Sequence, residues 1–264
     1  MANPVFSNSP VFGEKQQRQG ATLAAPSTID AASLEHMYDA PAATPRDTGR
    51  MTYDDVIMKT GALLALLVLS GAVTWVVAPG LWIIGAVVGL VLGLVNAFKR
   101  EPSPVLISLY AVAQGVFLGG LSAFYEAQYP GIVGQAVLGT LAVAATSLVV
   151  FKSGKVRVTP KFTRWLIIAM GGYLVFSLLN VVLMLFGVGG GQYGPLRSDN
   201  WGILVGLFAV GLAAACFLVD FDAVKRGVEG GAPRKMAWSA AFGLTVTLVW
   251  LYLEILRILA IFRN

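Results

Sequence analysis

Apolar residues along this chain come in long, nearly uninterrupted runs that begin shortly after residue 50. Residues 1 to about 50 are rich in Ala, Pro, Ser, Thr and Asn and lack the apolar stretch of roughly 7–15 residues that a secretory signal has. Beyond them, runs of about the 20 residues that a helix needs to cross a bilayer follow one another. We count seven runs: Gly61–Ala78, Leu81–Phe98, Pro104–Phe124, Gly131–Phe151, Trp165–Val188, Gly202–Val219 and Met236–Phe262.

The breaks between the runs carry turn-forming residues. Pro79-Gly80 joins the first two runs so tightly that they predict a helical hairpin. Before the first run, Thr52 and Asp55 have the spacing of a capping box, which predicts a helix start there. The pattern thus predicts helices throughout.

Composition agrees with a chain that lies in lipid. Hydrophobic residues make up 56% of the 264 and charged residues 12%, a balance that a soluble domain of this size does not need. We therefore predict an all-α, polytopic membrane protein of about seven transmembrane helices whose surroundings are the lipid bilayer. Its domains are expected to be a disordered cytoplasmic tail at residues 1–50 and a seven-helix transmembrane domain at residues 51–264.

The basic residues indicate how the spans are oriented. If the N-terminal tail lies in the cytoplasm and the spans alternate, all but three of the 19 Lys and Arg residues fall on the cytoplasmic side. The exceptions are Arg197, Arg257 and Arg263. The asymmetry predicts a cytoplasmic N-terminus and a C-terminus outside. The basic residues occupy short gaps between apolar runs rather than one face of a soluble domain, so no nucleic-acid partner is expected.

Several intramembrane chemistries lack the residues that they require. The last run contains no Lys for a retinal Schiff base, and His36, the only histidine, lies in the tail, which excludes haem ligation or a histidine base within the spans. Cys216 is the only cysteine and stands in an apolar run, without metal-type spacing. We expect no enzyme activity, no cofactor and no metal site.

Carboxylates in or beside the last two runs are the candidate functional groups, because an ionisable group at the bilayer centre costs at least a few kcal/mol. Asp220 and Asp222 occur in FLVDFDAVKRG, and Glu254 occurs in LYLEILRIL with Arg257 three residues later on the same helix face. Two interpretations of Glu254 remain open. It either forms a structural ion pair with Arg257 or a partner helix, or lies in a cavity where its charge depends on pH and cation binding.

These same residues resemble a known family. LVDFDAVKRG at Leu218–Gly227 and LYLEI at Leu251–Ile255 are similar to signature segments of the Bax inhibitor-1 family, the transmembrane Bax inhibitor motif proteins, over roughly residues 50–264. The N-terminal SNSPVF and the stretch from GAPRKMAW to VWLYLE resemble the actinobacterial form.

The resemblance implies seven helices with the last one central, and a pH-sensitive passive leak of calcium or other cations across the bacterial plasma membrane. In the family an acid on span six and one on span seven gate this leak. The span-six acid falls on Asp220 if Gly227 is the anchor, or on Asp222 if the Phe-Asp pair is. The span-seven acid falls on Glu254, where Asp is usual.

Spacing constrains how these acids meet. If the turn lies at Gly230-Gly231, Asp220 and Glu254 differ in depth by roughly 18 Å at about 1.5 Å per residue. Direct pairing then requires a separate inner segment before the last helix. Without it, the two aspartates meet cationic partners instead, for which the candidates are Lys99, Arg100 and Arg164.

Two other functions remain open. The first is a membrane-embedded regulator that binds a membrane protease or a stress-response partner through the 50-residue tail. The second is a proton-coupled transporter, which would show internal repeats or broken helices; the first three and next three runs show no clear self-similarity.

Overall fold

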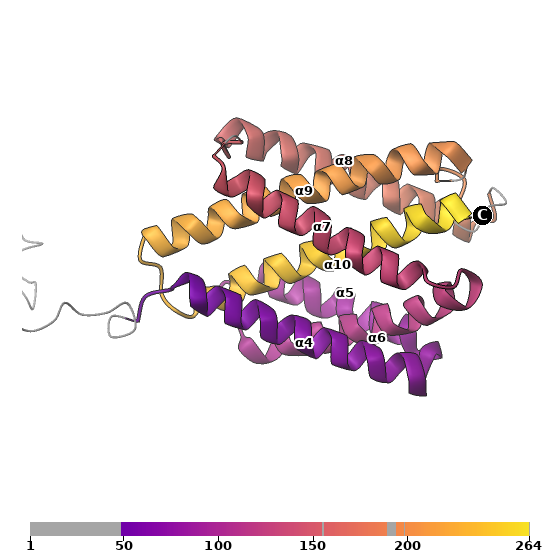
Figure 1. Ribbon diagram of the computed structural model, residues 1–264, viewed down its shortest axis with the longest axis horizontal. Coiled ribbons are helices and arrows are strands. Elements are labelled where there is room, and N and C mark those ends of the chain that lie inside the picture. The colour runs from indigo at the N-terminus through magenta and orange to yellow at the C-terminus, as the bar shows by residue number, and fades with distance from the viewer. Residues whose placement is uncertain (1–48, 155, 189–193, 198, 264) are drawn as a thin grey trace, which may run out of the picture. The chain divides into compact units, whose positions relative to one another are not determined.

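The computed structural model describes residues 49–264 except 155, 189–193, 198 and 264, and these residues fold as a bundle of long helices (Figure 1). Seven of the helices are long and apolar enough to cross a membrane. This confirms the all-α, seven-span prediction; the predicted tail lies outside the described residues. The helices are α4 (Tyr53–Val77), α5 (Trp82–Phe98), α6 (Pro104–Gln128), α7 (Ile132–Lys152), α8 (Pro160–Leu185), α9 (Asp199–Glu229) and α10 (Met236–Arg263), with a short 3-10 turn, η1 (Pro79–Leu81), between α4 and α5.

The last helix is the central one, as the family resemblance implied. α10 packs against α4, α6, α7 and α9, whereas α5 packs on α6 and α8 packs mainly on α9. Small side chains allow the closest of these approaches, as in other membrane bundles. At Gly119 of α6, an added Cβ would lie 2.2 Å from the Gly71 carbonyl oxygen of α4. The α4–α6 pair is therefore fixed by backbone contact.

Both predicted signals at the start of the bundle are present. The Thr52 hydroxyl accepts a hydrogen bond from the Asp55 backbone N–H at 3.1 Å. The Asp55 carboxylate accepts one from the Thr52 backbone N–H, which completes the capping box. Pro79-Gly80 forms the short turn that makes α4 and α5 a hairpin.

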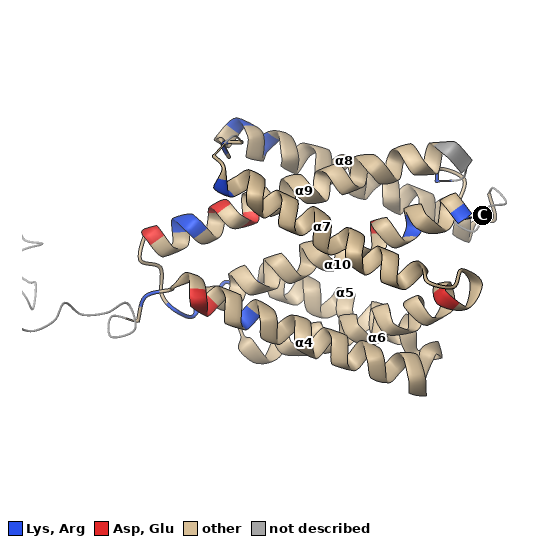
Figure 2. Ribbon diagram, in the orientation of Figure 1, with Lys and Arg blue, Asp and Glu red and all other residues tan. Residues whose placement is uncertain are grey.

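The sixth span is longer than its apolar run. The hydrophobic pattern ends at Val219, yet α9 continues for ten further residues to Glu229. Ion pairs one turn apart, Asp222 with Arg226 and Lys225 with Glu229, support this polar extension. Asp220 and Asp222 therefore lie within a helix. Charged residues gather at the end of the bundle where α4 begins and α9 ends (Figure 2).

The turn between α9 and α10 is formed at Gly230 and Gly231. Gly231 has a φ of +65°, the left-handed conformation that glycine adopts without strain. The Ala232 N–H donates to the Gly227 carbonyl and the Gly231 N–H to the Val228 carbonyl, which is the Schellman arrangement at a helix C-terminus. α10 then starts at Met236, so the intervening residues form a separate stretch before the last helix.

Candidate functional site

Glu254 lies on the central helix α10 and is almost fully buried, with 4% of its surface exposed. Trp250 and Arg257 share its helix face because they lie four residues before it and three after. The Trp250 Nε1 donates to Glu254 Oε1 at 3.2 Å, and the Arg257 Nη1 donates to the same oxygen at 3.3 Å. The Arg257 Nη2 also donates to Oε2. Glu254 thus forms the ion pair with Arg257 that one of the two interpretations anticipated.

A tyrosine on α8 completes the contacts of this carboxylate. The Tyr173 hydroxyl donates to Glu254 Oε1, and the Tyr173 ring packs against Trp250 with 5.6 Å between centroids. α8 is otherwise held mainly by α9. Glu254 therefore connects the outlying α8 to the centre of the bundle.

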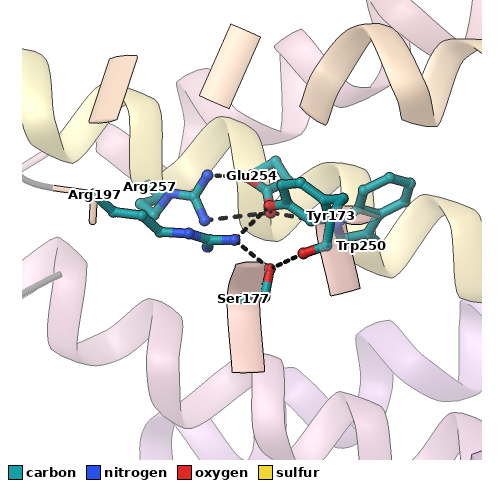
Figure 3. A network of polar contacts seen from close by, with 6 residues as sticks. All are labelled: Tyr173, Ser177, Arg197, Trp250, Glu254 and Arg257. Atoms are coloured by element: carbon teal, nitrogen blue, oxygen red, sulfur yellow. Dashed lines mark hydrogen bonds and ion pairs between the residues drawn. The ribbon is translucent and has the colours of Figure 1, made fainter. Parts of the chain in front are cut away.

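Arg197, in the segment between α8 and α9, reaches the same place. Its Nη2 donates to the Tyr173 hydroxyl at 2.8 Å and to the Ser177 hydroxyl. Its guanidinium lies 5.1 Å from the Tyr173 ring centroid and 5.7 Å from that of Phe176, within cation–π range. Figure 3 shows Arg197 and Arg257 reaching Tyr173 and Glu254 from the same side. We call this network the Glu254 clasp, consisting of Tyr173, Ser177, Arg197, Trp250, Glu254 and Arg257.

The charges of the clasp do not cancel. Two guanidinium groups face one carboxylate, and the Nε atoms of Arg197 and Arg257 are buried without a hydrogen-bond partner. Burial lowers the pKa of the Arg197 guanidinium, and the nearby Arg257 lowers it further, although arginine keeps its proton at physiological pH. Among the side chains that the structure describes, Glu254 is therefore the single anion that faces these two mutually repelling cations. Neutralising that charge would loosen the contact between α8 and α10.

Asp220, on α9, lies in different surroundings. The Thr247 hydroxyl of α10 donates to Asp220 Oδ2 at 2.8 Å. No Lys or Arg of the described residues forms an ion pair with Asp220. Its carboxylate lines a cavity of about 260 Å³, together with Gly227, Gly243 and Met51. Asp220 is thus a carboxylate that borders a cavity and forms no ion pair with a Lys or Arg of the described residues.

Asp222 is already paired. The Arg226 Nε donates to Asp222 Oδ2 at 2.9 Å, one turn along α9. The two side chains line a cavity of about 450 Å³ together with Arg164, one of the three predicted partners. Lys99 and Arg100 form no ion pair with the three acids among the described residues. Of the two span-six candidates, Asp220 is the one whose charge is left uncompensated.

The three predicted acids do not meet in one site. Asp220 is level with Thr247, which precedes Glu254 by seven residues, so the two carboxylates lie about 10 Å apart along α10 at ~1.5 Å per residue. This is less than the 18 Å inferred from the sequence, because the stretch between Glu229 and Met236 shifts the register of the two helices. Only a short connection separates α9 from α10, and it does not bring Asp220 to Glu254.

The residues that complete the clasp were not among the predicted ones. Tyr173, Ser177 and Arg197 lie far from Glu254 in the sequence, and only the packing of α8 brings them together. One signal was available. Arg197 is one of the three cations that the charge alternation placed opposite the majority, next to an apolar run. Among the described residues, no group of three His, Cys, Asp or Glu side chains is arranged to hold a metal ion.

Comparisons with known proteins give one finding. A family model described as Bax inhibitor 1 like matches residues 3–264, which is nearly the whole chain and includes the segment before α4. A search of curated proteins found no match.

Proposed function

The chain belongs to the Bax inhibitor-1-like family, as the motifs around Asp220 and Glu254 indicated, and on this premise we propose that it is a passive, pH-sensitive cation leak. The principal ion is calcium and the membrane is the bacterial plasma membrane. The protein conducts ions and catalyses no reaction. Its N-terminus lies in the cytoplasm and its C-terminus outside.

The observation that carries this proposal is the state of Asp220. A carboxylate with one hydroxyl donor, no cationic partner among the described residues and a cavity of about 260 Å³ beside it attracts a hard cation. Water in the cavity would complete the coordination, since one protein carboxylate is too few ligands for calcium. Weak binding of this kind suits conduction, because the ion has to leave again.

Glu254 has a different role in the proposed mechanism. Its carboxylate already accepts from Arg257 and Tyr173, so it does not bind the ion. It instead keeps α8 in contact with α10 through the clasp. A proton on Glu254 removes the charge that keeps Arg197 and Arg257 together, and α8 moves away from α10. Protonation of Glu254 then opens the path, whereas a proton on Asp220 removes the charge that attracts the cation.

The proposal is tested by reconstituting the protein in liposomes that contain a calcium indicator. Asp220→Asn keeps the size of the side chain and removes its charge, and we expect calcium influx to fall several-fold. Asp222→Asn is the matched control, two residues away on the same helix but paired with Arg226, and its flux is expected to stay near that of the wild type. Equal flux in wild type and Asp220→Asn would rule out Asp220 as the cation site.

A second function is favoured by the extent of the family match. Because the match begins at residue 3, the segment before α4 belongs to what the family shares. That segment suits the regulator that binds a membrane protease or stress-response partner. Deleting residues 1–48 separates the two functions: a lost cellular phenotype with unchanged liposome flux supports the regulator, and a flux that falls with the phenotype supports the leak alone.

A further inference from the structure

The residues just before α4 lie along the turn between α9 and α10. The Met51 N–H donates to the Ala232 carbonyl at 2.8 Å, and the Arg234 N–H donates to the Gly49 carbonyl at 2.9 Å. Between these bonds Arg50 and Pro233 form an antiparallel bridge. The chain thus makes a short ladder with a turn that is more than 180 residues away in sequence. We call residues 49–55 the latch.

Arg234 is the point at which the latch is fastened. Besides its backbone bond to Gly49, its Nε donates to the Asp55 Oδ1 at 2.8 Å, and its carbonyl accepts from the Lys59 Nζ at 3.1 Å. Asp55 is 7% exposed at its side chain, whereas that of Arg234 is 52% exposed. One partner of the ion pair is therefore buried and the other is open to competing ions or to a binding partner.

Met51 carries the latch into the Asp220 cavity. It is 4% exposed and lines that cavity together with Gly227 and Ala232, on the side next to the turn. A Cβ at Gly227 would lie 2.6 Å from the Met51 Cε, so the glycine makes room for the methionine. Asp220 lies further along α9, about two helical turns from Gly227. Met51 accordingly fills the part of the cavity next to the turn, while the carboxylate lies about two helical turns away along α9.

We propose that the latch closes the Asp220 cavity toward the end of the bundle where α4 begins, with Met51 as the plug, and that displacing residues 49–51 opens it. This rests on the proposed role of Asp220 as the cation site. Residues 49–51 connect the segment before α4 to the cavity, so tension on that segment breaks two backbone bonds and withdraws Met51. Any partner that binds the N-terminal segment thereby controls access of cations to Asp220.

An ordinary structural tie would use the same bonds, so the test measures access to the cavity itself. Gly243→Cys in a Cys216→Ala background places a thiol in the cavity, because a Cβ there meets only the Asp220 Oδ1, at 3.8 Å. The rate of labelling by a membrane-impermeant, cationic thiol reagent is measured in proteoliposomes. We expect Arg234→Gln, which removes the cation and leaves the Asp55 capping box intact, to raise this rate several-fold, and Arg234→Lys, which keeps the charge, to raise it less.

The matched control is another ion pair at the same end. Lys225 and Glu229 form an exposed ion pair on α9, with 3.9 Å between Nζ and Oε1, so Lys225→Gln removes a charge at the same end and is expected to leave the labelling rate unchanged. A labelling rate that stays constant when the Asp55–Arg234 pair is broken overturns the proposal, as does an equal increase in the control.

A reversible disulfide across the latch tests the proposal within one folded protein, so that the result does not depend on comparing variants that fold differently. Arg50→Cys with Pro233→Cys, again without Cys216, joins the two bridged positions by a disulfide that holds the latch shut. We expect calcium flux to fall under oxidation and to return with a reductant; flux that ignores the disulfide contradicts the plug. If the latch variants change the labelling rate but no variant changes calcium flux, the proposed latch is supported and the proposed leak is contradicted. If Asp220→Asn lowers the flux but the latch variants leave the labelling rate unchanged, the leak is supported and the latch is contradicted.

Discussion

At the scale of one residue, the Glu254 carboxylate keeps α8 in contact with α10 and is fully engaged in hydrogen bonds. Its carboxylate accepts from Arg257, Tyr173 and Trp250, and its burial would be unfavourable without them. Glu254→Gln keeps the size and removes the charge, which imitates protonation. We expect flux at neutral pH to rise toward the value that the wild type reaches at acidic pH, and the pH response to flatten. Calcium flux in liposomes over a pH series measures this; an unchanged pH profile removes Glu254 from the mechanism.

The Tyr173 hydroxyl is the atom that joins the two halves of the clasp. It donates to Glu254 and accepts from Arg197 at 2.8 Å, so Tyr173→Phe separates the second cation from the carboxylate. We expect a loss of about 1–2 kcal/mol of stability, since hydrogen bonds between membrane helices are worth about 0.6 kcal/mol on average and up to about 1.7. Thermal unfolding in detergent measures the loss. Tyr53→Phe, at an exposed position, is the control, and equal melting of the two variants would mean that the clasp contributes nothing.

At the scale of elements, the closest helix pair depends on the absence of side chains. Gly119→Ala would place a Cβ 2.2 Å from the Gly71 carbonyl oxygen, and backbone cannot yield as a side chain does. We expect α4 and α6 to separate at a cost of about 1–3 kcal/mol, as for overpacking in general. Gly211→Ala on α9 is the control, because no atom lies within 4 Å of its added Cβ. The difference between the two melting temperatures measures the effect, and no difference would mean that the pair adapts freely.

Sequence predicted the elements better than their contacts. Apolar length alone locates all seven spans, since a bilayer demands it, but it places the end of the sixth at Val219 because the criterion stops at the first charge. The helix itself continues, because Asp222 and Arg226 stabilise it one turn apart. Likewise the Glu254–Arg257 pair follows from spacing on one helix, whereas Tyr173 and Arg197 depend on how α8 is rotated, which no local pattern encodes.

At the scale of the whole molecule, the distance between Asp220 and Glu254 allows the two carboxylates to have different roles. Asp220, about two turns from the Gly227 end of its helix, is uncompensated among the described residues and borders a cavity; Glu254, about 10 Å away along α10, is buried and paired. A single switch in which both share a proton would need direct contact. Two separate sites instead permit one carboxylate to bind the ion and the other to respond to pH, with the latch acting on the first alone.

Orientation decides from which side the latch is reached. Placing the start of α4 in the cytoplasm puts all but three of the 19 basic residues on that side, and this positive-inside asymmetry directs insertion. The end of α10 then lies outside, where Arg263 donates to the Pro130 carbonyl in the α6–α7 turn and to Gln135 on α7, both at 2.9 Å. We therefore expect alkaline phosphatase fused after Arg263 to be active in cells and a green fluorescent protein at that position to be dark. Fusions after Ser153, in the α7–α8 turn, serve as the opposite control. Active phosphatase at Ser153 together with fluorescence at Arg263 would mean that the orientation is the reverse of the expected one. The latch would then face the outside rather than the cytoplasm.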